Sequence, residues 1–331
     1  MTFHEGDHKK PLVILIHGLG MEQNIWTDPC SARILGGALP ITVLLSEEPA
    51  QRDKVRSKIT PGDRPDPKDL RTVFHDLRDR GYPAITWSQQ RPAGPVDSAV
   101  KELTAVMEHA GKVHRGDIVL LCHSRGGLIA RKFLADSNSN VSALITICTP
   151  HRGSSIAKLA SYISPLVKIM TPFISDNTNS STLKKAVARV TDFMKSNAVE
   201  ELLPSSDFFQ TLSDRSKEGM RCLTLGGTRP RLFGFYRWKA KTAGGKRLIC
   251  PEEVLSFPGI LEKIIPAKLF PDELKRGLGD GLVTAASSRL DWSDEHHNFP
   301  LNHAQMLYDK RVREIIIRFI EAKEKTSRQS C

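Results

Sequence analysis

The sequence predicts an α/β fold in which a mostly parallel central sheet is flanked by helices on both faces. Short apolar runs alternate with amphipathic segments of helical period along the first half of the chain. Such alternation builds β-α-β units, whose strands run parallel because each connecting helix crosses a face of the sheet. The chain has 331 residues, 40% of them hydrophobic, which is enough to bury a sizeable core.

The strands are expected where short apolar runs stop at turn-forming residues. The first, residues 12–16 (LVILI), is rich in β-branched side chains and is followed by glycines. Further strands are expected at residues 41–45, 82–87, 117–121, 143–148 and 222–225.

The helices are expected where apolar residues recur at spacings of three and four. The first begins near Asp66, which can cap it, with Pro67 in its first turn, and it ends before Gly81. Further helices are expected at residues 97–110, 125–136 and 304–324, and residues 154–220 have a helical but irregular pattern.

Ser124 lies at the turn between a predicted strand and a predicted helix, in the stretch LLCHSRGGLIAR. This strand–turn–helix context is typical of a nucleophile elbow, G-x-S-x-G, although Cys122 replaces the first glycine here. Gly126 and Gly127 would let the helix approach the strand. The alternative is a serine that merely caps the helix in an ordinary βα turn.

A serine nucleophile needs a base and a carboxylate that orients the base. Downstream, Asp280 lies between glycines in GLGDGLV, and His303 lies in the turn NFPLNH. The order serine, acid, histidine is that of hydrolases with a nucleophile elbow. Asp291 and Asp294 are rival acids.

The other histidines have simpler interpretations. His123 is expected to pack beside the elbow, and His17 and His151 to hold loops by hydrogen bonds. His296 and His297 fall in a charged stretch and are expected at the surface of a loop.

Five motifs in order resemble the bacterial triacylglycerol lipase and esterase branch of the α/β-hydrolase superfamily. They are His17-Gly18-Leu19, the Ser124 elbow, TPHRGS at 149–154, DGLV at 280–283 and Asn302-His303. The resemblance implies one α/β-hydrolase domain over residues 1–331, with a helical lid or cap insertion at 154–220 and a second insertion at 226–276.

The resemblance also implies roles. Ser124 would be the nucleophile, His303 the general base and then acid, and Asp280 the group that orients His303. The backbone amides of Leu19 and Arg125 would form the oxyanion hole. The residues after Ser154 would form a helix with one apolar face, which either belongs to a lid over the acyl pocket or packs in the core. The residues of this face are Ile156, Leu159, Ile163, Leu166 and Met170.

Neither a metal nor another cofactor is expected. Secreted members of this branch bind calcium through an aspartate two residues after the histidine, where this chain has Gln305. The six cysteines form no CxxC pair, and the polar N-terminus lacks the apolar stretch of a signal peptide, which together favour a cytoplasmic protein.

The net charge of +11 is concentrated in residues 221–250, which contain eight Lys or Arg and no acid. Aromatic residues alternate with the charges, which favours a hairpin over a helix. Residues 229–247 would then contact an anionic membrane at its periphery, unless they form a solvated loop. No nucleic-acid-binding motif accompanies the charge.

The leading interpretation is a serine carboxylic-ester hydrolase that acts on a small acyl ester or a lipid through an acyl-enzyme. The same triad would serve an acyltransferase, a thioesterase or a phospholipase. A third possibility is a noncatalytic interaction protein built on a hydrolase scaffold.

Overall fold

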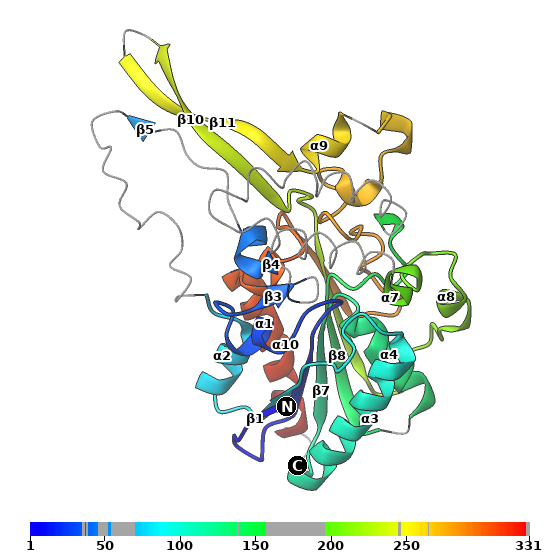
Figure 1. Ribbon diagram of the computed structural model, residues 1–331. Helices are drawn as coiled ribbons and strands as arrows, with labels where there is room; N and C mark the ends of the chain where they lie inside the picture. The colour runs from blue at the N-terminus through cyan, green and yellow to red at the C-terminus, as the bar shows by residue number, and fades with distance from the viewer. Residues whose placement is uncertain are drawn as a thin grey trace.

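The computed structural model describes residues 1–34, 37, 39–45, 52–53, 70–137, 139–156, 196–243, 246–263 and 265–328. One central sheet and the helices that cover it form the body of the molecule (Figure 1).

The central sheet has seven strands in the described chain. Their order is β1 (Thr2–His4), β6 (Ala84–Thr86), β2 (Leu12–Ile16), β7 (Ile118–His123), β8 (Val141–Ile147), β9 (Arg221–Gly227) and β12 (Glu295–Phe299). Only the β1–β6 pair in this sheet is antiparallel. The carboxyl ends of the six parallel strands therefore meet at one edge, where open α/β sheets bind their ligands.

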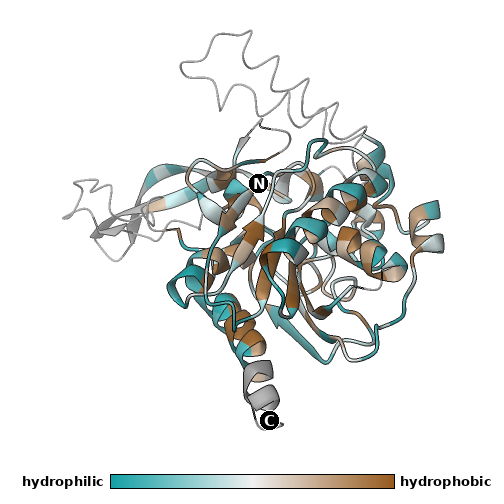
Figure 2. Cartoon of the chain, turned by 90° about the horizontal axis from the view of Figure 1, so that it is seen from below, coloured by the Kyte–Doolittle hydropathy of each residue, from teal (hydrophilic) through white to brown (hydrophobic). Residues whose placement is uncertain are grey.

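Helices cover both faces of the sheet. One face carries α1 (Asn24–Thr27), α2 (Val73–Asp79) and α10 (Lys310–Arg328), and the other carries α3 (Val96–Val113) and α4 (Gly126–Asp136). Seen from below, the apolar strands lie between helices whose outer surfaces are hydrophilic (Figure 2).

The core consists of two apolar layers, one on each face of the sheet. In β2, Val13 and Leu15 belong to one layer while Leu12, Ile14 and Ile16 belong to the other, and all five are at most 1% exposed. A strand that is buried on both faces needs apolar side chains at every position, which explains the uninterrupted LVILI run.

The remaining elements are short. They are the strands β3 (Arg33–Ile34), β4 (Leu39–Pro40) and β5 (Arg52–Asp53), the helices α7 (Asn197–Glu200), α8 (Asp207–Thr211) and α9 (Gly259–Glu262), and the 3₁₀ helices η1 (Ile41–Leu45), η6 (Ala267–Leu269), η7 (Asp272–Leu274) and η8 (Gln305–Leu307). Within the described residues, no helix combines the length and the apolar character that crossing a bilayer requires.

A long hairpin leaves the body of the molecule at the upper left of Figure 1. Its strands are β10 (Phe233–Ala243) and β11 (Lys246–Phe257), which pair antiparallel, and β5 pairs with β11. The hairpin predicted from the alternation of aromatic and basic residues is thus confirmed.

The sequence prediction was wrong at residues 41–45, which form η1 and not a strand. Ile41 and Leu44 are its buried residues, and a spacing of three suits the three residues per turn of a 3₁₀ helix. The strands β1 and β12 were missed because they are edge strands of mixed or polar sequence.

Helix boundaries also differ from the prediction. The helix expected from residue 304 begins at Lys310, because the Asp309 carboxylate accepts hydrogen bonds from the Arg311 and Val312 amides and caps it there. Residues 305–307 form the separate η8. The α2 helix begins at Val73 after the cap Thr72, and the predicted cap at Asp66 lies outside the described residues.

Candidate active site

The Ser124 elbow joins β7 to α4 in a strained turn. Ser124 has φ of 54°, in the left-handed region that costs a residue with a side chain about 1–2 kcal/mol. Its backbone is held on both sides: the Ser124 amide donates to the Ile147 carbonyl at 2.8 Å, and the Thr149 hydroxyl donates to the Ser124 carbonyl at 2.8 Å. The surrounding structure therefore fixes a conformation that the residue itself disfavours.

Glycines make room for this turn. A Cβ at Gly126 would lie 2.6 Å from the Ile16 carbonyl oxygen, and one at Gly18 would lie 2.8 Å from the Ser124 Cβ. The start of α4 and the loop after β2 thus approach the elbow at distances that only glycine allows.

His303 and Asp280 form a buried pair at the same edge of the sheet. The His303 Nδ1 and an Asp280 carboxylate oxygen are 2.8 Å apart, and both side chains are at most 2% exposed. A carboxylate only accepts hydrogen bonds, so Nδ1 carries the proton and Nε2 of the neutral ring is left as a proton acceptor.

The acid loop fixes the direction of the Asp280 carboxylate. Its other oxygen accepts hydrogen bonds from the amides of Leu282 at 2.9 Å and Val283 at 2.7 Å. The His303 amide also donates to the Asp280 carbonyl at 3.1 Å. Acid and histidine are therefore oriented by main-chain as well as side-chain contacts.

His123 connects this pair to the elbow. The rings of His123 and His303 are 4.8 Å apart at their centroids, and the His123 Nε2 donates to the His303 carbonyl at 3.2 Å. The hydrogen bonds of the described residues include none between the Ser124 hydroxyl and His303. Such contacts are often long in the free form of an enzyme and tighten when substrate binds.

The backbone amides of Leu19, in the loop after β2, and of Arg125, in the elbow, have no acceptor among the described residues. The neighbouring Gly20 amide, by contrast, donates to the Pro92 carbonyl at 3.1 Å. Unpaired N–H groups beside a serine are what an oxyanion hole requires.

The Arg125 side chain was missed by the sequence prediction, which considered only its amide. It is 1% exposed, and its guanidinium donates to the carbonyls of Pro92 and Gly94. Burial lowers the pKa of Arg125 to about 10, so it stays charged at neutral pH. The feature of the sequence that could have indicated this contact is the basic Arg125 inside the elbow motif, whose side chain binds the loop of Pro92 and Gly94.

The geometry at His17 and His151 agrees with loop-holding roles. His17 accepts from the Gln89 amide at Nε2 and donates to the Gly18 carbonyl from Nδ1, and burial lowers its pKa to about 4. His151 contacts the Thr146 hydroxyl through Nε2 at 3.1 Å, and burial also lowers its pKa. Both rings are therefore neutral near pH 7 and stabilise their loops through hydrogen bonds.

The rival acids lie elsewhere. Asp291 pairs with Arg152, both more than half exposed, and the Asp294 carboxylate accepts the amide of Cys222, at the beginning of β9. His296 and His297 belong to β12 and are partly buried, so their prediction as surface loop residues was wrong.

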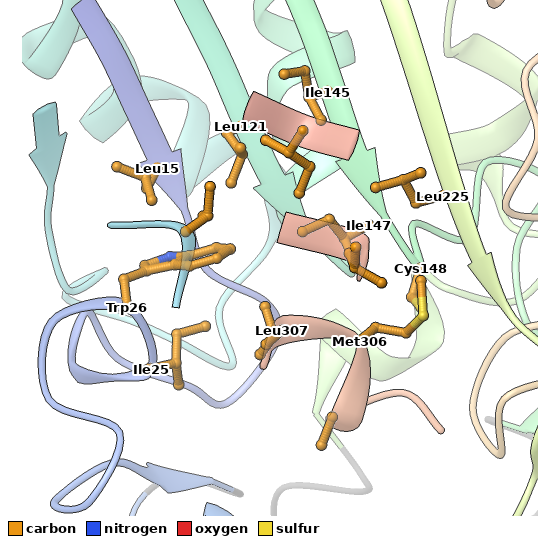
Figure 3. Packing of buried hydrophobic residues seen from close by; sticks show 14 of the residues in the cluster. Leu15, Ile25, Trp26, Leu121, Ile145, Ile147, Cys148, Leu225, Met306 and Leu307 are labelled. Atoms are coloured by element: carbon orange, nitrogen blue, oxygen red, sulfur yellow. The ribbon is translucent and has the colours of Figure 1, made fainter. Parts of the chain in front are cut away.

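Cys148 was also missed. It follows β8 with φ of 52°, and a nitrogen of His303, a carboxylate oxygen of Asp280 and the Cys148 Sγ all lie within 4.8 Å of one another. This is a ligand set that suits zinc. However, burial and the Asp280 charge raise the pKa of the Cys148 thiol, which favours the protonated, non-ligating form. Figure 3 shows Cys148 packed beside Met306.

Asn302 and Gln305 shape the turn that carries His303. The Asn302 side chain donates to the carbonyls of Leu44 and Arg231, and its oxygen accepts the Gln305 amide at 2.8 Å. The Gln305 side chain in turn accepts the Asn302 amide at 3.2 Å. The Gln305 side chain thus stabilises the turn through hydrogen bonds with Asn302. That the protein does not depend on calcium stays a prediction.

Of the predicted pocket residues, only Ile156 is described, and it packs half-buried against the core. The other four, Leu159, Ile163, Leu166 and Met170, lie outside the described residues.

The basic segment is partly neutralised by acids just beyond it. Arg237 and Lys239 on β10 both contact Glu252 on β11, at 2.7 and 3.0 Å. Trp238, the residue between them in sequence, is 46% exposed, and its side chain points to the opposite face of the strand. Counting residues 221–250 alone leaves out the partner strand's acids and overstates the surface charge.

One family of known proteins matches part of the chain in sequence. The family described as palmitoyl protein thioesterase matches residues 83–221, which include the elbow. No curated protein matches the chain in sequence.

Solved structures give a wider match. The mature lipase BlEst2 of Bacillus licheniformis is 16% identical, with a TM-score of 0.56 over 96% of this chain and 98% of that one. Its propeptide form has the same identity and TM-score, over 96% of this chain and 53% of that one. A metagenomic carboxyl esterase, MGS0156, is 14% identical over 96% of this chain and 78% of that one, with a TM-score of 0.49. The chain therefore shares the α/β-hydrolase fold of the lipase BlEst2.

Proposed function

We propose that this protein is a serine carboxylic-ester hydrolase whose triad is Ser124, Asp280 and His303. The observation that carries the proposal is the buried His303–Asp280 hydrogen bond of 2.8 Å, at the sheet edge where the Ser124 elbow has its strained backbone. A histidine whose Nδ1 is fastened to a carboxylate presents Nε2 as a base.

The reaction would run in two halves. The Ser124 Oγ attacks the ester carbonyl while its proton passes to the His303 Nε2, and the amides of Leu19 and Arg125 stabilise the oxyanion. The protonated His303 then gives this proton to the leaving alcohol, which leaves an acyl group on Ser124. Water, deprotonated by His303, releases the acid and restores the serine.

An acyl thioester is the second candidate substrate. The specific observation in its favour is the match of residues 83–221 to the family described as palmitoyl protein thioesterase. The same groups would serve, with a thiol as the leaving group. An acyltransferase or phospholipase would differ only in the acceptor or the head group, and a noncatalytic scaffold would not need the buried His303–Asp280 hydrogen bond.

Fluorophosphonate labelling tests the proposal directly. The probe should modify Ser124 in the wild type and fail to modify Ser124→Ala, whereas a noncatalytic protein would remain unlabelled. A chain-length series of p-nitrophenyl esters, compared with acyl-CoA and phospholipid substrates, then identifies the acyl group and the leaving group. Absence of labelling and of turnover on every substrate would contradict the proposal.

The hairpin supplies a route to lipid substrates. It exposes the aromatic ring of Trp238 and the cations Arg237 and Lys239, side-chain types that gather at the interface of an anionic membrane. Peripheral contact through residues 229–247 remains part of the proposal, with the charge reduced by Glu252. A cytoplasmic location and an acyl pocket that includes Ile156 remain predictions from the sequence.

A further inference from the structure

Glu273 is a buried carboxylate close to the acid loop. It lies in η7, seven residues before Asp280, and is 3% exposed. One of its oxygens accepts the Ser155 amide at 2.6 Å and the other accepts the Ser155 hydroxyl at 2.7 Å. No lysine, arginine or histidine in the described chain forms an ion pair with it.

The backbone of Glu273 supports the acid loop directly. Its carbonyl accepts the Gly281 amide at 2.9 Å, and a Cβ at Gly279 would lie 2.4 Å from the Glu273 Cα. The two residues that flank Asp280 therefore rest against Glu273. Its side chain, at the same time, holds the segment that follows β8.

Further hydrogen bonds close this connection. The Ser154 hydroxyl donates to the Leu282 carbonyl at 2.6 Å, and the Ser287 hydroxyl donates to the Gly153 carbonyl at 2.7 Å. Leu282 is also one of the two residues whose amides hold the Asp280 carboxylate. The segment 153–155 and the acid loop thus form one hydrogen-bonded unit that includes the acid of the proposed triad.

Among the described residues this buried carboxylate has no cationic partner, which makes it a costly way to hold two segments together. Removing its charge from water is unfavourable, and a neutral side chain of the same shape would avoid that cost. A carboxylate, however, accepts both hydrogen bonds from Ser155 at once, one on each oxygen, whereas a glutamine has a single acceptor oxygen. The second acceptor oxygen thus fixes the geometry of the loop more tightly.

We infer that Glu273 is a positioning residue for the proposed triad. Through the acid loop it holds the Asp280 carboxylate in line with the His303 Nδ1. This inference rests on the proposed function, because a positioning role has meaning only if Asp280 orients a catalytic histidine.

A double-mutant cycle with Asp280 tests the inference. Glu273→Gln should lower kcat for a p-nitrophenyl ester by roughly 10- to 100-fold, the size expected when a catalytic group is misplaced by a fraction of an ångström to an ångström, with KM changed by less than about twofold. In the Asp280→Asn background the same change should cost less than about threefold, because no carboxylate remains to be aimed.

The control is Asp272→Asn, which changes the neighbouring residue of the same turn. Asp272 is exposed and pairs with Lys275, so kcat should remain near the wild-type value. Ser155→Ala removes the hydroxyl donor and leaves the amide donor in place, so it should reproduce the pattern of Glu273→Gln and keeps the test available if one variant folds poorly. Melting temperatures and near-UV circular dichroism identify such variants.

The outcomes separate two failures. If Glu273→Gln costs the same factor with Asp280 and with Asn at position 280, or costs nothing in either background, the positioning role is wrong while the triad stands. If the wild type neither turns over esters nor labels at Ser124, the proposed function itself is wrong.

Discussion

The candidate active site and the β10–β11 hairpin are held together in opposite ways. At the site, Ser124, Asp280 and His303 come from distant parts of the chain, and hydrogen bonds from other segments hold the backbone or side chain of each. Along the hairpin, pairing is mainly between neighbouring strands, and its ion pairs are solvent-exposed. A change at the site should therefore alter chemistry by orders of magnitude, and a change on the hairpin should act weakly and depend on salt.

The largest effect is expected for Ser124→Ala. Without the hydroxyl no acyl-enzyme forms, and kcat for a p-nitrophenyl ester should fall on the order of 10⁴- to 10⁶-fold, with an equal loss for His303→Ala because the members of a triad act as a unit. The exposed Ser216→Ala is the matched control and should retain full activity. Near-wild-type turnover by Ser124→Ala would place the chemistry elsewhere.

Asp280→Asn should have the next largest effect. The amide side chain would disturb the tautomer of His303, and kcat should fall by as much as about 10⁴-fold while Ser124 stays in place. Asp294→Asn and Asp291→Asn should change kcat little, since both carboxylates engage other partners. The opposite ranking of Asp280 and Asp294 in the same assay would move the acid to the rival position.

A pH-dependent loss of stability is expected from His17. Burial holds its pKa at about 4, against 6.5 for the exposed ring, so the unfolded chain binds a proton that the folded one refuses. The free energy of unfolding therefore keeps its full value above the unfolded pKa of about 6.5 and decreases as the pH falls toward 4. At about pH 5 the loss due to His17 is about 2 kcal/mol.

Urea unfolding of His17→Gln at about pH 7.5 and about pH 5 measures this contribution. The variant should show a difference in unfolding free energy between the two pH values that is smaller than that of the wild type by about 2 kcal/mol. An identical pH dependence in wild type and His17→Gln would show that His17 is not the buried neutral ring described above.

The smallest effect is expected on the hairpin. Replacing Arg237, Lys239 and Lys241 by serine should weaken sedimentation with phosphatidylserine vesicles by roughly tenfold at low salt, since each free cation contributes about 1 kcal/mol and two of the three share Glu252. Turnover of a soluble ester should not change.

Glu252→Gln is a control on the hairpin that should change vesicle binding in the opposite direction to the triple serine variant. It releases both cations and should strengthen vesicle binding, and high salt should abolish the difference between variants. Equal binding of all variants, or equal binding to neutral vesicles, would leave the hairpin without a membrane role.

The same contrast explains what the sequence could predict. The β2 strand was recognisable because burial on both faces demands apolar residues throughout, and the Ser124 elbow because its strain demands small neighbours. Both features depend only on residues that are close together in the sequence, so the sequence alone can predict them. Such prediction fails for β12, whose place is set by the neighbouring β9 and not by its own polar sequence.

Contacts between distant segments could not be predicted in the same way. Nothing near Glu273 in the sequence indicates that its partner is Ser155, and nothing near Arg237 identifies Glu252 except the hairpin register. The assignment of Asp280 over Asp294 rested on flanking glycines and on resemblance. The structure adds the hydrogen bond to His303 that no pattern of spacing contains.

The left-handed backbone at Ser124 has a consequence for how this site can change over time. A residue with a Cβ is disfavoured there, so Ser124→Gly should unfold at a higher temperature than Ser124→Ala, with a difference of about 1 kcal/mol in the free energy of unfolding. Mutational drift at this position is then biased toward glycine and a more stable chain. The nucleophilic role proposed for Ser124 would supply the selection that keeps a serine there against this bias.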